Sequence, residues 1–159
     1  MATTTAAITL TSADLLTDAL SLSATSTLHK AGSTEGLDQT TGMAKAYLTA
    51  TSAIDIFPAI VEDTTNLRPF NGTSSWIYIS NMSTDETEYI TVKICEQVVG
   101  KLYAGDFLWM PWSQGADVTN AANHHGDITI APSVDTGMWV EWTCINEGTE
   151  YHTENLAIA

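Results

Sequence analysis

The chain has 159 residues, the size of one domain, and its apolar content of 44% is enough to build a hydrophobic core. Five Lys and Arg face 19 Asp and Glu, and a formal net charge of −14 argues against binding to nucleic acid or to anionic membranes. No apolar run approaches the ~20 residues of a spanning helix, and residues 1–5 lack the basic start of a signal peptide, so we expect synthesis in a cytoplasm.

The first third of the chain differs from the rest. Residues 1–52 are rich in Thr, Ser, Ala and Gly and contain no Trp or Phe, whereas all five Trp and all three Phe lie from Phe57 onward. Aromatic side chains contribute strongly to the energy of a core. We therefore expect residues 1–53 to form an N-terminal arm or peripheral strands, and residues 54–159 to form the core of the domain.

Within the first third, the pattern predicts four elements. Residues 12–20 are typical of a short helix that Ser12 would cap, and residues 20–28 alternate like a half-buried strand. Residues 31–42 contain three glycines and predict a flexible loop. Residues 48–56 predict a second strand that ends before Pro58.

Beyond residue 70 the alternation of apolar and polar residues becomes stronger. It predicts a turn at 71–74 and a polar loop at 81–88. A second turn is predicted at 134–137, and a long polar segment at 113–126. The predicted strands cover residues 76–80, 89–95 (with Ile90, Val92 and Ile94 on one face), 127–131 (ended by Pro132) and 138–145.

Residues 98–112 predict a tight hairpin. Two alternating runs, 98–103 and 107–112, flank Ala104-Gly105-Asp106, and Gly105 supplies the positive φ of a two-residue hairpin turn. In total, the sequence predicts seven or eight short strands with turn residues between them. This pattern predicts an all-β fold, either an antiparallel β-sandwich or a jelly roll, with an extended Thr/Ser-rich N-terminal arm.

The sequence offers little support for catalysis. The best candidate metal ligands are in His124-His125-Gly126-Asp127, but adjacent side chains point apart on a strand, so a solvated polar loop is the preferred interpretation. The Gly-x-Ser-x-Gly motif and the glycine-rich phosphate loop are both absent. We therefore predict no catalytic residue, no cofactor and no metal, and a protein that is not an enzyme.

The two cysteines are expected to remain free thiols. Cys95 falls on the polar face of its predicted strand, whereas Cys144 falls on the apolar face of the last one. Synthesis in a reducing cytoplasm favours the same interpretation.

The aromatic residues have two interpretations: a platform that stacks on a ligand, as in sugar-binding modules, or a core combined with a subunit interface. The predicted strand 138–145 carries Trp139 and Trp142 on opposite faces, and the run 107–112 does the same with Trp109 and Trp112. A strand of this kind is buried on both faces or exposes one of them to a partner. We favour the partner, with Trp76, Tyr103, Trp109, Trp112 and Trp139 as the interface candidates.

Several segments, taken in order, resemble small virion structural proteins of tailed bacteriophages, notably marine and cyanobacterial phages. They are Trp76-Ile-Tyr-Ile-Ser-Asn, Glu88-Tyr-Ile-Thr-Val, Val99-Gly-Lys-Leu-Tyr-Ala-Gly-Asp-Phe-Leu-Trp-Met-Pro-Trp112, Ile128-Thr-Ile-Ala-Pro-Ser and Trp139-Val-Glu-Trp142. Two N-terminal segments, Leu10-Thr-Ser-Ala-Asp-Leu-Leu and Gly36-Leu-Asp-Gln-Thr-Thr-Gly42, resemble the same group, so the resemblance extends over most of the chain. It implies a β-rich, multicopy particle component made in the host cytoplasm, and it carries over no catalytic residue.

From this resemblance we expect a capsid decoration or cement protein located in the virion. Its partners would be the major capsid protein or other virion proteins. The strands with Trp on both faces predict that it also associates with itself, as a trimer. A tail, neck or fibre component that binds host surface carbohydrate is the alternative, and a non-viral carbohydrate-binding module is a third. In each virion role the N-terminal arm would become ordered on contact with neighbouring subunits.

Overall fold

The computed structural model describes residues 3–13, 20–49, 51–57, 74–94, 97–112 and 128–147. These ranges contain strands, turns and irregular segments, and no helix. The strands are β1 (Thr4–Ser12), β2 (Leu20–Leu28), β3 (Gln39–Thr40), β4 (Ala44–Leu48), β5 (Ile54–Phe57), β6 (Ser75–Asn81), β7 (Tyr89–Ile94), β8 (Gln97–Tyr103), β9 (Phe107–Pro111), β10 (Ile128–Pro132) and β11 (Met138–Asn146).

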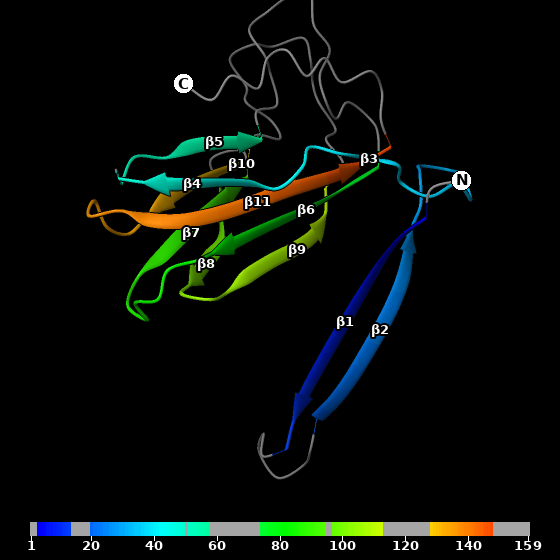
Figure 1. The fold of residues 1–159 in the computed structure, drawn as a ribbon, viewed down its shortest axis with the longest axis horizontal. Coiled ribbons are helices and arrows are strands. Elements are labelled where there is room, and N and C mark those ends of the chain that lie inside the picture. The colour runs from blue at the N-terminus through cyan, green and yellow to red at the C-terminus, as the bar shows by residue number, and fades with distance from the viewer. Residues whose placement is uncertain are drawn as a thin grey trace, which may run out of the picture.

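Two antiparallel sheets form a sandwich, and a separate two-stranded hairpin extends from it (Figure 1). The first sheet has the order β3-β11-β6-β9, and β4 pairs with β11 further along the same edge. The second sheet has the order β5-β10-β7-β8. The expectation of an all-β fold with antiparallel, sandwich-like sheets is confirmed.

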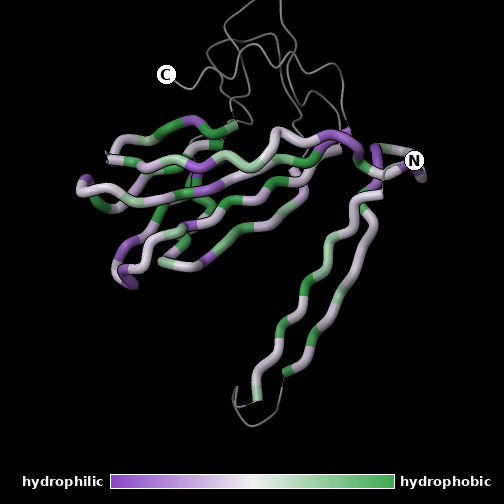
Figure 2. Tube along the Cα trace, in the orientation of Figure 1, coloured by the Kyte–Doolittle hydropathy of each residue, from purple (hydrophilic) through white to green (hydrophobic). Residues whose placement is uncertain are grey.

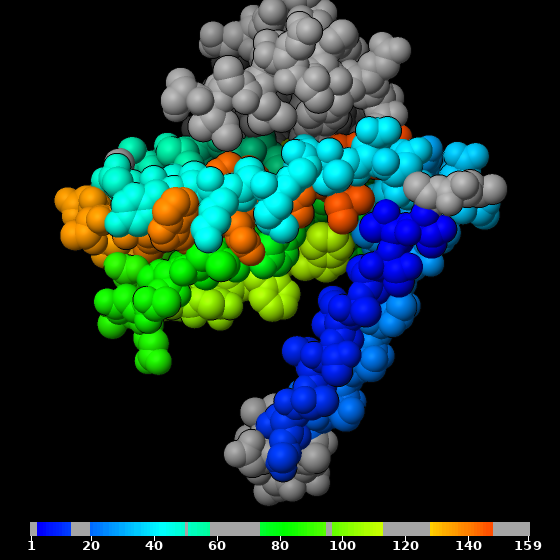
Figure 3. All heavy atoms as spheres, viewed as in Figure 1, coloured from blue at the N-terminus to red at the C-terminus, as the bar shows by residue number. Residues whose placement is uncertain are grey.

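The hairpin of β1 and β2 leaves the sandwich at one end and runs away from it, as Figures 1 and 3 show. Its strands pair in unbroken register from Thr4 with Leu28 to Ser12 with Leu20. Since side chains alternate across a strand, all even-numbered residues of both strands share one face. Apolar residues recur along both strands on that face (Figure 2).

At its base the hairpin is tied to the following loop. Leu28 and Leu37 are buried, the Leu37 amide donates to the Leu28 carbonyl at 2.9 Å, and the Thr4 hydroxyl donates to the Leu37 carbonyl at 2.8 Å. Lys30 forms an ion pair with Asp38 at 2.8 Å across the same loop. These contacts fix where the hairpin begins, while its outer part packs chiefly on itself.

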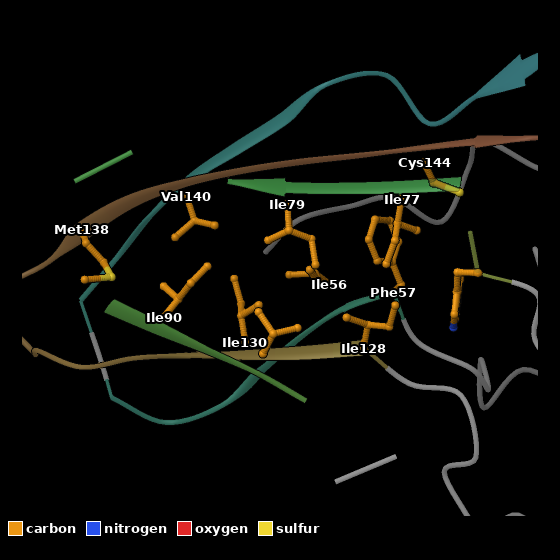
Figure 4. Packing of buried hydrophobic residues seen from close by; sticks show 12 residues of the cluster. Ile56, Phe57, Ile77, Ile79, Ile90, Ile128, Ile130, Met138, Val140 and Cys144 are labelled. Carbon is orange, nitrogen blue, oxygen red and sulfur yellow. The ribbon is translucent and has the colours of Figure 1, made fainter. Parts of the chain in front are cut away.

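The core lies between the two sheets, where the labelled side chains of Figure 4 meet. The central strands β6, β7, β10 and β11 present their apolar parity inward because the side-chain period of two gives each one inner and one outer face. Fully burying each aliphatic side chain contributes about 1.5–3 kcal/mol. The buried members of the core are Ile56, Phe57, Ile77, Ile79, Ile90, Val92, Trp112, Ile128, Ile130, Met138, Val140 and Cys144.

Four predicted strands are confirmed as β6, β7, β10 and β11, and the parity predicted for β7 is correct because Ile90 and Val92 are buried and Ile94 packs against the core. The turn before β11 is also present, with Gly137 at φ 105°. Pro132 is the last residue of β10 and pairs with Ile90. Local alternation was sufficient to place these elements.

The predicted hairpin at residues 98–112 is wrong. β8 pairs with β7 in one sheet, while β9 pairs with β6 in the other, so the chain changes sheets at residues 104–106. Gly105 does have a positive φ of 80°, and the Asp106 amide donates to the Tyr103 carbonyl at 2.9 Å. One positive φ at the third position is typical of a type II turn, which splays the flanking strands instead of pairing them.

The predictions for the first third need three corrections. The single strand expected at 48–56 is two strands, β4 and β5, which belong to different sheets. Ser12 and Leu20, the ends of the predicted helix, are cross-strand partners, and β1 was not predicted at all. The loop at 31–42 contains β3 and the buried Leu37.

The predicted half-buried character of residues 20–28 is also wrong. Leu20 and Leu22 are exposed because the hairpin stands apart from the sandwich. Some predictions lie outside the described residues: the helix interior at 14–19, the turn at 71–73, the polar segment at 113–126 with its His pair, Cys95, and the tail after residue 147.

Candidate functional site: an aromatic sheet face

Six aromatic side chains lie on the outer face of the sheet that contains β11, and we call this surface the aromatic face. Its strands alternate, so each aromatic residue points outward while its neighbours in sequence enter the core. On β6, for example, Ile77 and Ile79 are fully buried and Tyr78 between them is not. The aromatic face consists of Tyr47 on β4, Trp76 and Tyr78 on β6, Phe107 and Trp109 on β9, and Trp139 on β11.

The strand register brings these side chains together in pairs. Trp139 lies directly opposite Tyr47, and their ring centroids are 5.1 Å apart. Trp76 stacks on Trp109 at 5.3 Å with an interplanar angle of 25°. Tyr78 and Phe107 lie at 6.1 Å. Each pair at these distances contributes about 0.5–1.5 kcal/mol beyond its burial, so the rings stabilise one another on this face.

Much of this apolar area is accessible. Phe107 is 61% exposed, Tyr47 49% and Trp139 46%, at the two ends of the face, whereas the residues between them are half-buried. Large exposed aromatic side chains gathered on one face of a sheet make this surface a candidate for interaction.

Two charged residues lie among the aromatic rings, and they are of opposite sign. Lys45 and Glu141 are cross-strand partners on β4 and β11. The Lys45 ammonium lies 5.1 Å from the centroid of the Trp139 ring, and the Tyr78 hydroxyl donates to Glu141 Oε1 at 3.2 Å. The central part of the face therefore carries no net charge, although the chain as a whole carries −14.

The turn before β11 positions Tyr47. The Tyr47 hydroxyl donates to the Thr136 carbonyl at 3.2 Å, and its ring lies where a side chain on Gly137 would project. The absence of a side chain at Gly137 thus allows the Tyr47 ring to lie beside Trp139.

The structure separates the interface candidates that the sequence suggested. Trp76, Trp109 and Trp139 share the aromatic face. Tyr103 lies on β8 in the opposite sheet, where its ring is 5.4 Å from that of Tyr89. Trp112 is only 5% exposed and packs on Phe57 at 5.8 Å, so it is a core residue with almost no surface to offer a partner.

Tyr47 was missed by the sequence analysis, although a signal for it exists. Ala44, Ala46 and Leu48 alternate with Lys45 and Tyr47, which is the pattern of an edge strand with one inner face. Only the pairing with β11 places Tyr47 beside Trp139, and that pairing joins residues about 90 positions apart.

Reactive groups are sparse in the part of the chain that the structure describes. No three His, Cys, Asp or Glu side chains converge there as a metal site would require. Cys144 is buried against Ser75 and Asn146, and burial raises the pKa of its thiol to about 12, so it is protonated and unreactive at neutral pH. Across the same ranges, no helix is long and apolar enough to cross a membrane.

Comparisons with known proteins identify no relative: no protein family, no curated protein and no solved structure matches the chain. A function for it is therefore proposed from its own sequence and from its two exposed apolar surfaces, the aromatic face and the β1–β2 hairpin.

Proposed function

We propose that this chain is a non-enzymatic structural protein of a multicopy assembly, and specifically a capsid decoration or cement protein of a tailed bacteriophage. The observation that carries the proposal is the pair of large surfaces without net charge on a chain of net charge −14. The virion role itself comes from the sequence resemblance of residues 76–142. The major capsid protein and neighbouring copies of this chain would be the partners.

The distribution of charge supports an assembly role. β1 and β2 contain no charged residue at all, and the aromatic face balances Lys45 against Glu141. Elsewhere on the chain acidic side chains predominate, so copies repel one another over most of their surface. Contacts between copies are then favoured where acidic charge does not accumulate, as at these two surfaces.

A second candidate function is favoured by one detail of the aromatic face. Trp139 and Tyr47 are exposed side by side, and Lys45 and Glu141 lie next to them as hydrogen-bonding groups. Flat aromatic rings flanked by polar groups also suit the apolar face of a sugar ring. This arrangement supports the alternative of a tail, neck or fibre component that binds host surface carbohydrate.

The copy number in purified particles tests the proposal. A decoration protein would be present in hundreds of copies, whereas a tail or neck component would be present in about a dozen or fewer. Quantitative mass spectrometry of particles gives this number. Absence of the chain from purified particles would overturn the virion role, and specific binding on a glycan array would favour the second candidate.

A further inference from the structure

We propose that the apolar face of the β1–β2 hairpin of one copy docks on the aromatic face of another copy. This inference rests on the proposed multicopy function and names the contact that builds the assembly. Ile8, Leu10, Leu20 and Leu22 define the hairpin surface, and each is between 41% and 53% exposed. Ala6 and Ala24 extend the same face.

The hairpin has one apolar and one polar face. Leu10 and Leu22 are cross-strand partners, as are Ile8 and Ala24, so the large aliphatic side chains form one continuous strip. The opposite face carries Thr and Ser at seven of its eight positions: Thr5, Thr9, Thr11, Ser21, Ser23, Thr25 and Thr27. A two-faced pattern of this kind is that of a sheet with one buried side.

Among the described residues of its own chain, nothing covers this strip. Figures 1 and 3 show the hairpin extending away from both sheets of the sandwich. An isolated two-stranded hairpin is only marginally stable in water, and it becomes stable when a third strand or another apolar surface packs against it. Strands of nine residues would therefore gain stability from an apolar surface outside the described part of the chain, and in this proposal a second copy supplies it.

The aromatic face fits that requirement in length and in charge. The strip runs over six residue steps, from Ala6 to the pair of Ser12 with Leu20, and the face also runs over six, from Trp139 to Ile145, the partner of Trp76. Both therefore extend over about 20 Å. The strip has no charge, and the face pairs Lys45 with Glu141. Docking therefore brings together two surfaces on which no net acidic charge accumulates.

A contact between two different surfaces is heterologous, so every copy both donates a hairpin and receives one. Such a contact closes into a ring when the rotation between copies allows it and otherwise continues as an open chain. The trimer expected from the sequence is one such closed ring.

The decisive variant, which we call the strip variant, puts charge into the strip. Leu10→Asp with Leu22→Asp would bury carboxylates in the contact, and we expect the dissociation constant for self-association, measured by sedimentation, to rise about 100-fold. The control is Thr9→Asp with Ser23→Asp, a cross-strand pair on the opposite face that adds the same charge. The control is expected to associate like the unmodified chain, and equal losses in both variants would overturn the proposal.

A mixing experiment identifies the surface that receives the hairpin. The face variant, Trp139→Ser with Phe107→Ser, removes exposed rings from the aromatic face and leaves the hairpin intact. Neither the face variant nor the strip variant should associate alone, but a mixture of the two should form a one-to-one dimer. If the face variant associates alone, the hairpin does not dock on the aromatic face. If the strip variant associates alone, the hairpin is not needed for self-association.

Incorporation into particles distinguishes a failure of the docking proposal from a failure of the proposed function. If the strip variant is absent from assembled particles while the control is present in normal copy number, both proposals are supported. If both variants are incorporated equally, the structural role stands and hairpin docking is overturned. Far-ultraviolet circular dichroism and thermal unfolding of each variant, compared with those of the unmodified chain, test whether the sandwich is folded.

Discussion

Asn81 is a single residue that joins both sheets and the turn between them. Its side chain is fully buried, the amide nitrogen donates to the Leu102 carbonyl on β8 at 3.1 Å, and its oxygen accepts from the Ser83 amide at 2.9 Å. Its backbone carbonyl accepts from the Gly105 amide at 3.0 Å. A residue that the sequence placed in a polar loop is thus an organising part of the fold.

We expect Asn81→Asp to destabilise the protein by about 2–4 kcal/mol. The substitution keeps the size of the side chain but replaces the donor to Leu102 with an oxygen, which leaves two buried acceptors facing each other. Chemical denaturation measures the free energy of unfolding. Ser83→Ala is the control, because it leaves Asn81 and the backbone amide that donates to it unchanged. If Asn81→Asp were as stable as the unmodified chain, Asn81 would not organise the fold in this way.

The backbone conformation of Gly137 leaves room for the Tyr47 ring on the aromatic face. At φ 105° an added side chain is strained, and its β-carbon would meet the Tyr47 ring. Gly137→Ala should cost about 1–3 kcal/mol and displace Tyr47 from Trp139. The measurement is thermal unfolding together with Trp fluorescence. Gly100→Ala is the matched control because it has open space and no positive φ.

The buried thiol of Cys144 makes the free energy of unfolding depend on pH in the alkaline range. Burial raises the pKa of its thiol to about 12, from about 9 in an exposed thiol, so the folded protein holds this proton more tightly than the unfolded chain. The stabilisation is fully present below pH 9 and is lost as the pH rises from 9 toward 12. Unfolding free energies measured from pH 7 to 11 should fall more steeply for the unmodified chain than for Cys144→Ala. Identical slopes would show that this thiol does not contribute.

At the scale of elements, the turn at 103–106 decides which sheet each neighbouring strand joins. Gly105→Val forces a β-branched residue to φ 80°, and since no atom lies within 4 Å of the added β-carbon, the whole effect is backbone strain of about 1–3 kcal/mol. We expect a lower melting temperature, with Gly105→Asn much less affected because Asn tolerates this conformation. Equal melting temperatures for Val and Asn would exclude the turn as described.

The β1–β2 hairpin shows the limit of pattern at this scale. Its alternation is as regular as that of β7, yet β7 is buried on one face and the hairpin is exposed on both faces along most of its length. The alternating pattern shows that one face of a strand is apolar. Which part of the molecule covers that face depends on the path of the chain.

At the scale of the whole molecule, the net charge of −14 sets how association responds to salt. Copies repel through their acidic surfaces but, in the proposed contact, touch through surfaces without net charge. Added salt screens the repulsion and strengthens the burial of apolar surface, so self-association should tighten as NaCl rises from 0.05 to 0.5 M, that is, from about a 14 Å to a 4 Å screening length. Sedimentation velocity across this series is the measurement, and weaker association at high salt would mean that ion pairs hold the copies together.

The sequence by itself determined the fold class and the faces of the central strands. Most of β6, β7 and β11 was found from alternation, as the predicted strands 76–80, 89–95 and 138–145, because a period of two is a local property of the backbone. The tertiary structure alone decided that β8 and β9 belong to different sheets, that β4 brings Tyr47 to Trp139, that Trp112 is buried, and that β1 and β2 stand apart. These features depend on contacts between residues distant in sequence. A strand carries the same alternating pattern whichever partner it pairs with.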